Sequence, residues 1–156
     1  MRVKICGLTN PADTQAAIEA GAEALGFNFF PGSKRYLVRN GAADWLQEVP
    51  AIVRRVAVLV NPTFEDVMAV AALPFIDGVQ LHGAETPAFC AALQRAGVKF
   101  GKALPVLDLG LTDDPSAFAT RTIVLDAQHA GEFGGTGRTV PWPIARDLVE
   151  RYPDLR

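Results

Sequence analysis

The chain has 156 residues, with 15 lysines and arginines against 17 aspartates and glutamates, so its formal net charge is −2, and 49% of its residues are hydrophobic. This length fits one globular domain over residues 1–156. The apolar share excludes a disordered chain, and the near-zero charge lacks the basic surface of nucleic-acid-binding proteins. Because no apolar run approaches ~18 residues and the two cysteines form no CxxC pair, we expect a cytoplasmic protein without a leader or membrane span.

Short runs rich in apolar and β-branched residues recur along the chain at intervals of 22 to 31 residues. The runs are Arg2–Cys6, Ala24–Phe29, Arg55–Val60, Gly78–His82, Phe100–Ala103 and Thr122–Asp126. In the third run, residues 56–60 are apolar throughout, which is typical of a strand buried on both faces of a parallel sheet. The runs therefore predict six strands.

Residues that start and stop helices fall between these runs. Asn10 and Pro11 offer a cap and a proline at the first helical position, and Gly21 offers a stop. Similar signals recur at Thr63, at Thr86-Pro87 with Gly97, at Asp114-Pro115 for the fifth helix and at Pro143 for the sixth. The chain is therefore predicted to contain six βα units in succession.

Repeated βα units leave two architectures, an open doubly wound sheet and a closed TIM (βα)8-barrel. Polar side chains follow the first, second, fourth and sixth predicted strands. This distribution favours the barrel, in which the carboxyl ends of all strands face one mouth. Because a complete barrel typically needs about 250 residues and at least about 200, we expect an incomplete barrel of six units, truncated after the sixth helix.

Cys6 lies where the first predicted strand becomes a loop. Free cysteine is most often a small buried residue, and Cys90, inside the fourth predicted helix, is assigned to that class. A thiol at the mouth of a barrel can instead lose its proton and act as a base or nucleophile. On its local sequence alone, Cys6 fits either description.

Three other polar residues are placed at or after strand ends. Asp126 closes an apolar strand, where it is either a loop cap or an acid that its apolar neighbours keep protonated for donation. His82 is either a hydrogen-bonded lining residue or part of the mouth. Arg35 is either a solvated cation or a planar fork for a carboxylate.

Metal and nucleotide motifs are not evident. The two histidines, His82 and His129, form no HxxxH or HxH pair, so a zinc site is not expected. The loop 134–137, with sequence GGTG, lacks the spacing of a dinucleotide or phosphate-binding motif, and we predict that it is a mobile cover over the mouth. An open nucleotide-binding module is disfavoured, because residues 6–9 after the first strand are poor in glycine.

Five segments, KICGLT, GFNFFPGSKRY, VLVNP, VQLHG and VLDA…GGTG, occur in this order and together resemble the phosphoribosylanthranilate isomerase family over essentially the whole chain. The resemblance implies an isomerase of tryptophan biosynthesis that acts on N-(5-phosphoribosyl)anthranilate by an Amadori rearrangement. It further implies Cys6 as general base and Asp126 as general acid, with two substrate-binding residues, Arg35 for the anthranilate carboxylate and His82 in the pocket lining. We expect Cys6 and Asp126 to face a common cavity. No cofactor or metal is implied.

The resemblance also implies two further βα units, whose loops bind the substrate phosphate, and none follows Arg156. We therefore expect either a piece of a longer, active protein or an impaired isomerase. In the second case a homodimer, or a swapped or edge-paired assembly, is expected. The alternative function is a non-catalytic incomplete barrel that pairs its open strand edges with a partner chain. Neither a nucleic acid nor a membrane is an expected partner.

Overall fold

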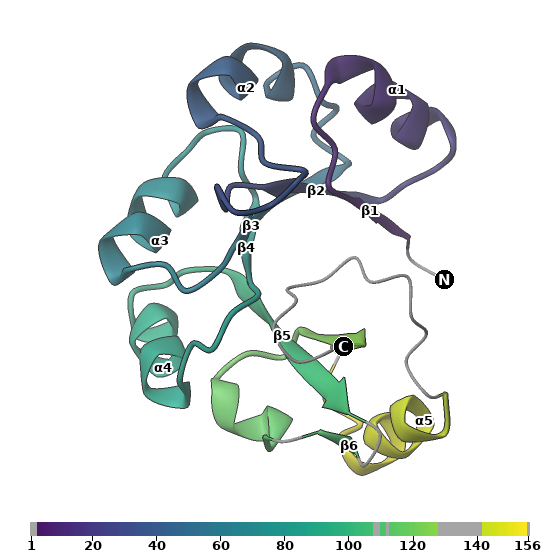
Figure 1. Ribbon diagram of the computed structural model, residues 1–156, viewed down its shortest axis with the longest axis vertical. Coiled ribbons are helices and arrows are strands. Elements are labelled where there is room, and N and C mark those ends of the chain that lie inside the picture. The colour runs from purple at the N-terminus through teal and green to yellow at the C-terminus, as the bar shows by residue number, and fades with distance from the viewer. Residues whose placement is uncertain (1–2, 108–109, 112, 128–141, 156) are drawn as a thin grey trace. The chain divides into compact units, whose positions relative to one another are not determined.

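The computed structural model describes residues 3–107, 110–111, 113–127 and 142–155 (Figure 1). Contacts within the chain group it into two compact units, residues 1–80 and residues 81–156. The boundary falls inside strand β4 (Gly78–Leu81). The single domain expected over residues 1–156 concerns both units together and stays a prediction.

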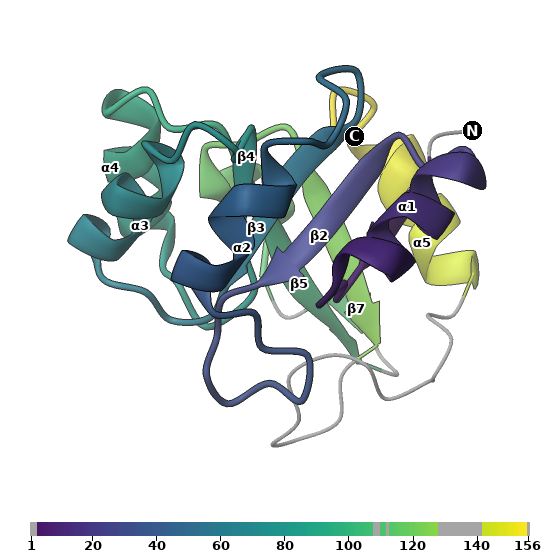
Figure 2. The same cartoon turned by 90° about the horizontal axis from the view of Figure 1, so that it is seen from above.

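Unit 1 is built on parallel strands in the order β1 (Lys4–Cys6), β2 (Ala24–Asn28) and β3 (Arg54–Leu59). Helix α1 (Pro11–Glu19) connects the first two strands, α2 (Arg39–Leu46) connects the next two, and α3 (Phe64–Ala71) follows β3 (Figures 1 and 2). The first three predicted strands are therefore confirmed, each within two residues of its predicted start.

The core of unit 1 forms because the middle of β2 is apolar and buried. Leu25 and Phe27 have no exposed surface, and the Phe27 ring meets Trp45 of α2 edge-on, with ring centroids 5.7 Å apart. This contact packs α2 against the strand. Aromatic pairs in this geometry contribute about 0.5–1.5 kcal/mol beyond the burial of their area.

The helix-start residues in the sequence act as predicted. The Asn10 side chain accepts a hydrogen bond from the Asp13 N–H at 2.9 Å, and Gly21 after the helix has a φ of +87°. Thr63 and Asp66 form a reciprocal capping box at the start of α3. In unit 2, Thr86 caps α4 (Pro87–Arg95). Gly97 follows that helix with a φ of +76°.

Unit 2 contains a parallel pair, β5 (Phe100–Leu107) and β7 (Ile123–Ala127), which run side by side (Figure 2). In their register Pro105 lies opposite Asp126. Helix α5 (Trp142–Arg151) follows, close to the predicted start at Pro143. Among the described residues, no helix is both long enough and apolar enough to cross a membrane.

The prediction of a fifth α-helix is wrong. Asp114 does cap a helix, accepting from the Ser116 N–H at 2.9 Å, but the element is a four-residue 3₁₀-helix, η1 (Pro115–Phe118). It stops because Ala119 adopts a left-handed conformation with a φ of +54°. The two-residue strand β6 (Gly110–Leu111), antiparallel to β5, was also not predicted.

Candidate functional site

In unit 1, Cys6 and Arg35 lie next to each other. Cys6 is the last residue of β1 and its side chain is exposed. The guanidinium of Arg35 donates from Nη1 to the Cys6 carbonyl oxygen at 3.1 Å. The two predicted residues are 29 positions apart in the sequence, so the fold brings a thiol and a fixed positive charge to the same strand end.

The loop after β2 places Arg35. The Ser33 hydroxyl accepts a hydrogen bond from the Arg35 backbone N–H at 3.1 Å and another from the Asn28 side-chain amide at 3.0 Å. The Leu37 N–H donates to the Asn28 carbonyl at 2.8 Å. The segment between Asn28 and Leu37 is thus folded back on the end of β2, and Arg35 is held at the side of β1.

Two glycines leave the space that Cys6 and Arg35 occupy. Gly26 lies opposite Cys6 in the β1–β2 register, and a Cβ placed on it would lie 2.5 Å from the Cys6 Sγ. Gly7 has a φ of +87°, and a Cβ there would lie 2.5 Å from the Arg35 Cδ. Both contacts are far shorter than the ~3.5–4.0 Å of ordinary van der Waals contact. A side chain at Gly7 or Gly26 would therefore displace Arg35 or Cys6, and the positive φ of Gly7 also favours glycine there.

In unit 2, His82 and Asp126 form a second pair. His82 directly follows β4, and Asp126 is the fourth residue of β7. The His82 Nε2 lies 2.9 Å from the Asp126 Oδ2, and about one fifth of each side chain is exposed. A nitrogen and an oxygen at this distance form a hydrogen bond only if one of them carries the proton. This hydrogen bond lies next to open space.

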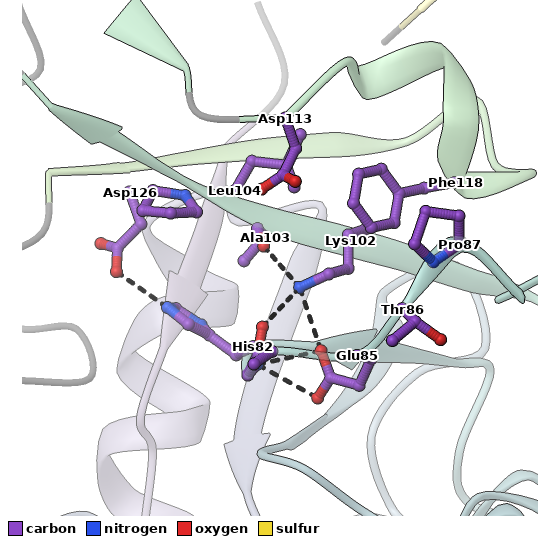
Figure 3. Close-up of a pocket in the computed structure, with 13 residues that line it drawn as sticks. His82, Glu85, Thr86, Pro87, Lys102, Ala103, Leu104, Asp113, Phe118 and Asp126 are labelled. Carbon is purple, nitrogen blue, oxygen red and sulfur yellow. Dashed lines mark hydrogen bonds and ion pairs between the residues drawn. The ribbon is translucent and has the colours of Figure 1, made fainter. Parts of the chain in front are cut away.

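That open space is a cavity of about 340 Å³ within unit 2 (Figure 3). Its polar lining residues include His82, Asp126 and Asp113, together with a Lys102–Glu85 ion pair. The Lys102 Nζ lies 3.0 Å from the Glu85 Oε2, and both side chains are almost completely buried. A cavity of this size with a few convergent polar groups is typical of sites for small molecules.

Cys90 is a packing residue, as predicted. It lies in α4 with no exposed surface, and burial raises the pKa of its thiol to about 11. A thiol with this pKa stays protonated at neutral pH, so Cys90 is not a candidate nucleophile. Of the two cysteines, only Cys6 is accessible.

The structure thus places the predicted residues in two pairs, Cys6 with Arg35 and His82 with Asp126. The expectation that Cys6 and Asp126 face one cavity concerns both units together and stays a prediction. The remaining predicted features, His129 and the loop 134–137, lie outside the described residues. Among the described residues, no group of three or more histidine, cysteine, aspartate and glutamate side chains could hold a metal ion.

Four residues at the site were missed by sequence reasoning, namely Gly7, Gly26, Glu85 and Lys102. No motif marks Glu85 and Lys102, which are 17 positions apart and pair only through the tertiary structure. For Gly26 a signal existed: a glycine inside an otherwise apolar strand often marks a close approach of another group.

Comparison with known proteins gives a consistent match. The family model for N-(5′-phosphoribosyl)anthranilate isomerase matches residues 3–154. A curated relative of that name from Geobacter metallireducens is 41% identical over 153 residues, which cover 98% of this chain and 74% of the relative. The chain therefore spans about three quarters of this relative's length.

Solved structures agree with this match. The crystal structure of phosphoribosyl anthranilate isomerase from Thermotoga maritima superimposes with a TM-score of 0.82 at 35% identity, covering 100% of this chain and 74% of the other. Another such isomerase was solved in complex with reduced 1-(o-carboxyphenylamino)-1-deoxyribulose 5-phosphate. It superimposes with a TM-score of 0.77 at 33% identity and covers 100% of this chain and 72% of that one.

Proposed function

The chain belongs to the N-(5′-phosphoribosyl)anthranilate isomerase family, and on that premise we propose a function and a set of residue roles. The chain isomerises N-(5-phosphoribosyl)anthranilate to 1-(2-carboxyphenylamino)-1-deoxyribulose 5-phosphate in tryptophan biosynthesis. It has the TIM-barrel-like α/β fold of that family. The observation that carries the proposal is the match of the family model to residues 3–154, a range that contains all four predicted site residues.

The first step needs a general acid, and Asp126 is proposed for it. Transfer of a proton to the furanose ring oxygen lets the bond between this oxygen and C1′ break, which leaves a protonated Schiff base between C1′ and the anthranilate nitrogen. The place of Asp126 in the cavity lining supports this role, and its hydrogen bond to the His82 Nε2 orients the carboxyl group there. A placed acid contributes roughly 10²–10⁴-fold to such a step.

The second step needs a base, and the Cys6 thiolate is proposed for it. The positive Schiff base acidifies the hydrogen on C2′, and its removal places the electron pair in an enolamine. This product tautomerises to the ketone when C1′ gains a proton and the C2′ hydroxyl loses one. The exposed sulfur of Cys6 supports the role, since a base must reach the substrate.

Arg35 is proposed to bind the carboxylate of the anthranilate ring. Its guanidinium makes one hydrogen bond to the Cys6 carbonyl, and a planar guanidinium has further N–H donors that suit a carboxylate. His82 is proposed to contact the substrate through its place in the cavity lining. The chemistry involves proton transfers only, so the chain is proposed to work without a cofactor or metal.

The function is tested with the purified chain and synthetic substrate, and by growth without tryptophan of a bacterial strain that lacks this isomerase. Turnover is expected, together with a fall of roughly 10²–10⁴-fold in kcat for Cys6→Ser and for Asp126→Asn. Asp147→Asn, at an exposed residue of α5 that pairs with Arg151, is the matched control for the second variant. It should keep the parent kcat.

Two results would contradict the proposal. Absence of both turnover and growth from a folded chain would show that residues 1–156 alone do not carry the isomerase function. Parent-like kcat in Cys6→Ser or Asp126→Asn would remove the role of that residue while leaving the function in place. Cytoplasmic location and homodimer formation stay predictions, which cell fractionation and sedimentation can examine.

A further inference from the structure

The Lys102–Glu85 ion pair is the feature of unit 2 that the proposed reaction does not use. The exposed fractions of the two side chains are only 3% and 2%. Removing two charges from water is costly, and well-packed apolar residues of similar volume often stabilise a protein as well or better. Packing alone therefore does not explain a buried ion pair in the wall of this cavity.

Lys102 makes all of its hydrogen bonds inside the protein. Its ammonium group has three N–H donors. They reach the Gly83 carbonyl at 2.7 Å, the Ala103 carbonyl at 2.8 Å and the Glu85 carboxylate at 3.0 Å (Figure 3). The ring of Phe118 covers the ammonium at 5.7 Å. Because all three donors are used and the ammonium is covered, Lys102 has no free N–H group with which to bind a substrate.

Together the two charged residues hold one peptide segment from both sides. The Gly83 N–H donates to both carboxylate oxygens of Glu85, at 3.1 and 3.0 Å, and the Gly83 carbonyl accepts from Lys102. Gly83 directly follows His82. The ion pair therefore fixes the backbone immediately after His82.

The same ion pair connects the elements that carry His82 and Asp126. Lys102 lies on β5, which pairs with β7 along five residue positions, including Pro105 opposite Asp126. The connection thus runs from the loop after β4, through Lys102, to the strand pair that holds Asp126. It fixes the elements whose side chains meet at 2.9 Å.

We propose that Lys102 and Glu85 are positioning residues, which hold His82 in hydrogen-bond contact with Asp126. The catalytic part of this proposal rests on the isomerase function above. Loss of the ion pair should let the backbone after His82 move and weaken the His82–Asp126 contact. Since a misplacement of about 1 Å can cost about 10²-fold in rate, we expect kcat to fall by about 10- to 100-fold, with a much smaller change in KM.

The test compares the parent with the double variant Lys102→Met/Glu85→Leu, which removes both charges at similar volume. The first measurement is the nitrogen NMR signals of the His82 ring, which report its proton position and hydrogen bonding. Because the chain has two histidines, a His129→Gln background leaves His82 as the single source of these signals. The second measurement is kcat and KM.

The matched control removes a different ion pair. The side chains of Arg55 and Asp77 form two hydrogen bonds with each other, at 2.9 and 3.0 Å, within unit 1. Arg55→Met/Asp77→Leu should lower stability without changing the His82 signals. Shifted His82 signals in the Lys102/Glu85 variant alone, with a lower kcat, are the expected result. Unchanged signals and kcat in a folded Lys102/Glu85 variant would overturn the proposal.

Glu85→Gln serves if the double variant does not fold. It keeps the shape and one oxygen for the Gly83 N–H but removes the charge opposite Lys102, and unchanged His82 signals together with unchanged kcat would again overturn the proposal. The NMR measurement also separates the two hypotheses. If the Lys102/Glu85 variant shows shifted His82 signals but the parent chain has no isomerase activity, the proposed function of this chain is disproved and the positioning role stands.

Discussion

Replacing Gly26 with alanine should displace the thiol of Cys6. The added Cβ would lie 2.5 Å from the Cys6 Sγ and 3.1 Å from both its Cα and its Cβ. Carbon contacts are normally about 3.5–4.0 Å, so the sulfur must move by roughly 1 Å and β1 must shift slightly away from β2. A displacement of this size predicts a fall of about 10²-fold in kcat. Overpacking of the strand pair adds about 1–3 kcal/mol of destabilisation.

The assay for Gly26→Ala follows the loss of the aromatic amine substrate and gives kcat and KM, while urea unfolding gives the stability. Gly41→Ala is the control, because it adds the same methyl group in α2, where nothing lies within 4 Å of the new atom. It should stabilise the chain by about 0.5–1 kcal/mol and leave kcat unchanged. A parent-like kcat in Gly26→Ala would mean that the sulfur tolerates displacement or has no role, and would refute this prediction.

Three further outcomes are expected. Arg35→Ala should raise KM about 10- to 100-fold, since a hydrogen bond to a charged group contributes about 1.5–3 kcal/mol; an unchanged KM would exclude carboxylate binding. Burial raises the pKa of Cys90 from 9.0 to about 11. Its contribution to stability is therefore complete below pH 9 and lost between pH 9 and 11, a decline that urea unfolding should show and that Cys90→Ala should reduce. Thr63→Ala removes the capping box of α3 and should cost about 1 kcal/mol in thermal unfolding, whereas Gln47→Ala after α2 should cost less.

Those parts of the fold with a local cause could be predicted from the sequence. Strands appeared as apolar runs because parallel strands are covered on both faces. Helix α1 was visible because its cap lies in the sequence just before it. Helix α2 had no such signal, since Val38 at its start makes no side-chain capping hydrogen bond. The end of η1 depends on the left-handed backbone of Ala119, a residue type that gives no hint of it.

The residues of the candidate site also fall into those with a local sequence signal and those without one. Cys6 and Asp126 stood out because each lies at the end of a predicted strand, and the family resemblance gave them roles that the structure leaves as proposals. The bond from Arg35 to the Cys6 carbonyl depends on how the loop after β2 folds back, which no local pattern records. For Lys102 the sequence is misleading, because a lysine in an apolar run suggests an exposed edge of the strand. Two of the three acceptors that satisfy its buried ammonium, Gly83 and Glu85, are distant in the sequence.

The connections after α1 and α4 have equal lengths. Gly21 lies eleven positions after Asn10 and Gly97 eleven after Thr86, and in both cases the next strand begins three residues later. In each fourteen-residue span the cap and the glycine mark the two ends of the helix, so the same local signals set both connections. The loops that lead from β1 and β4 into these spans are set differently, by the positive φ of Gly7 beside Arg35 and by the contacts of Glu85 and Lys102 with Gly83. The two helical connections are therefore defined by signals close by in the sequence, whereas the loops beside the reacting groups depend on residues far away along the chain.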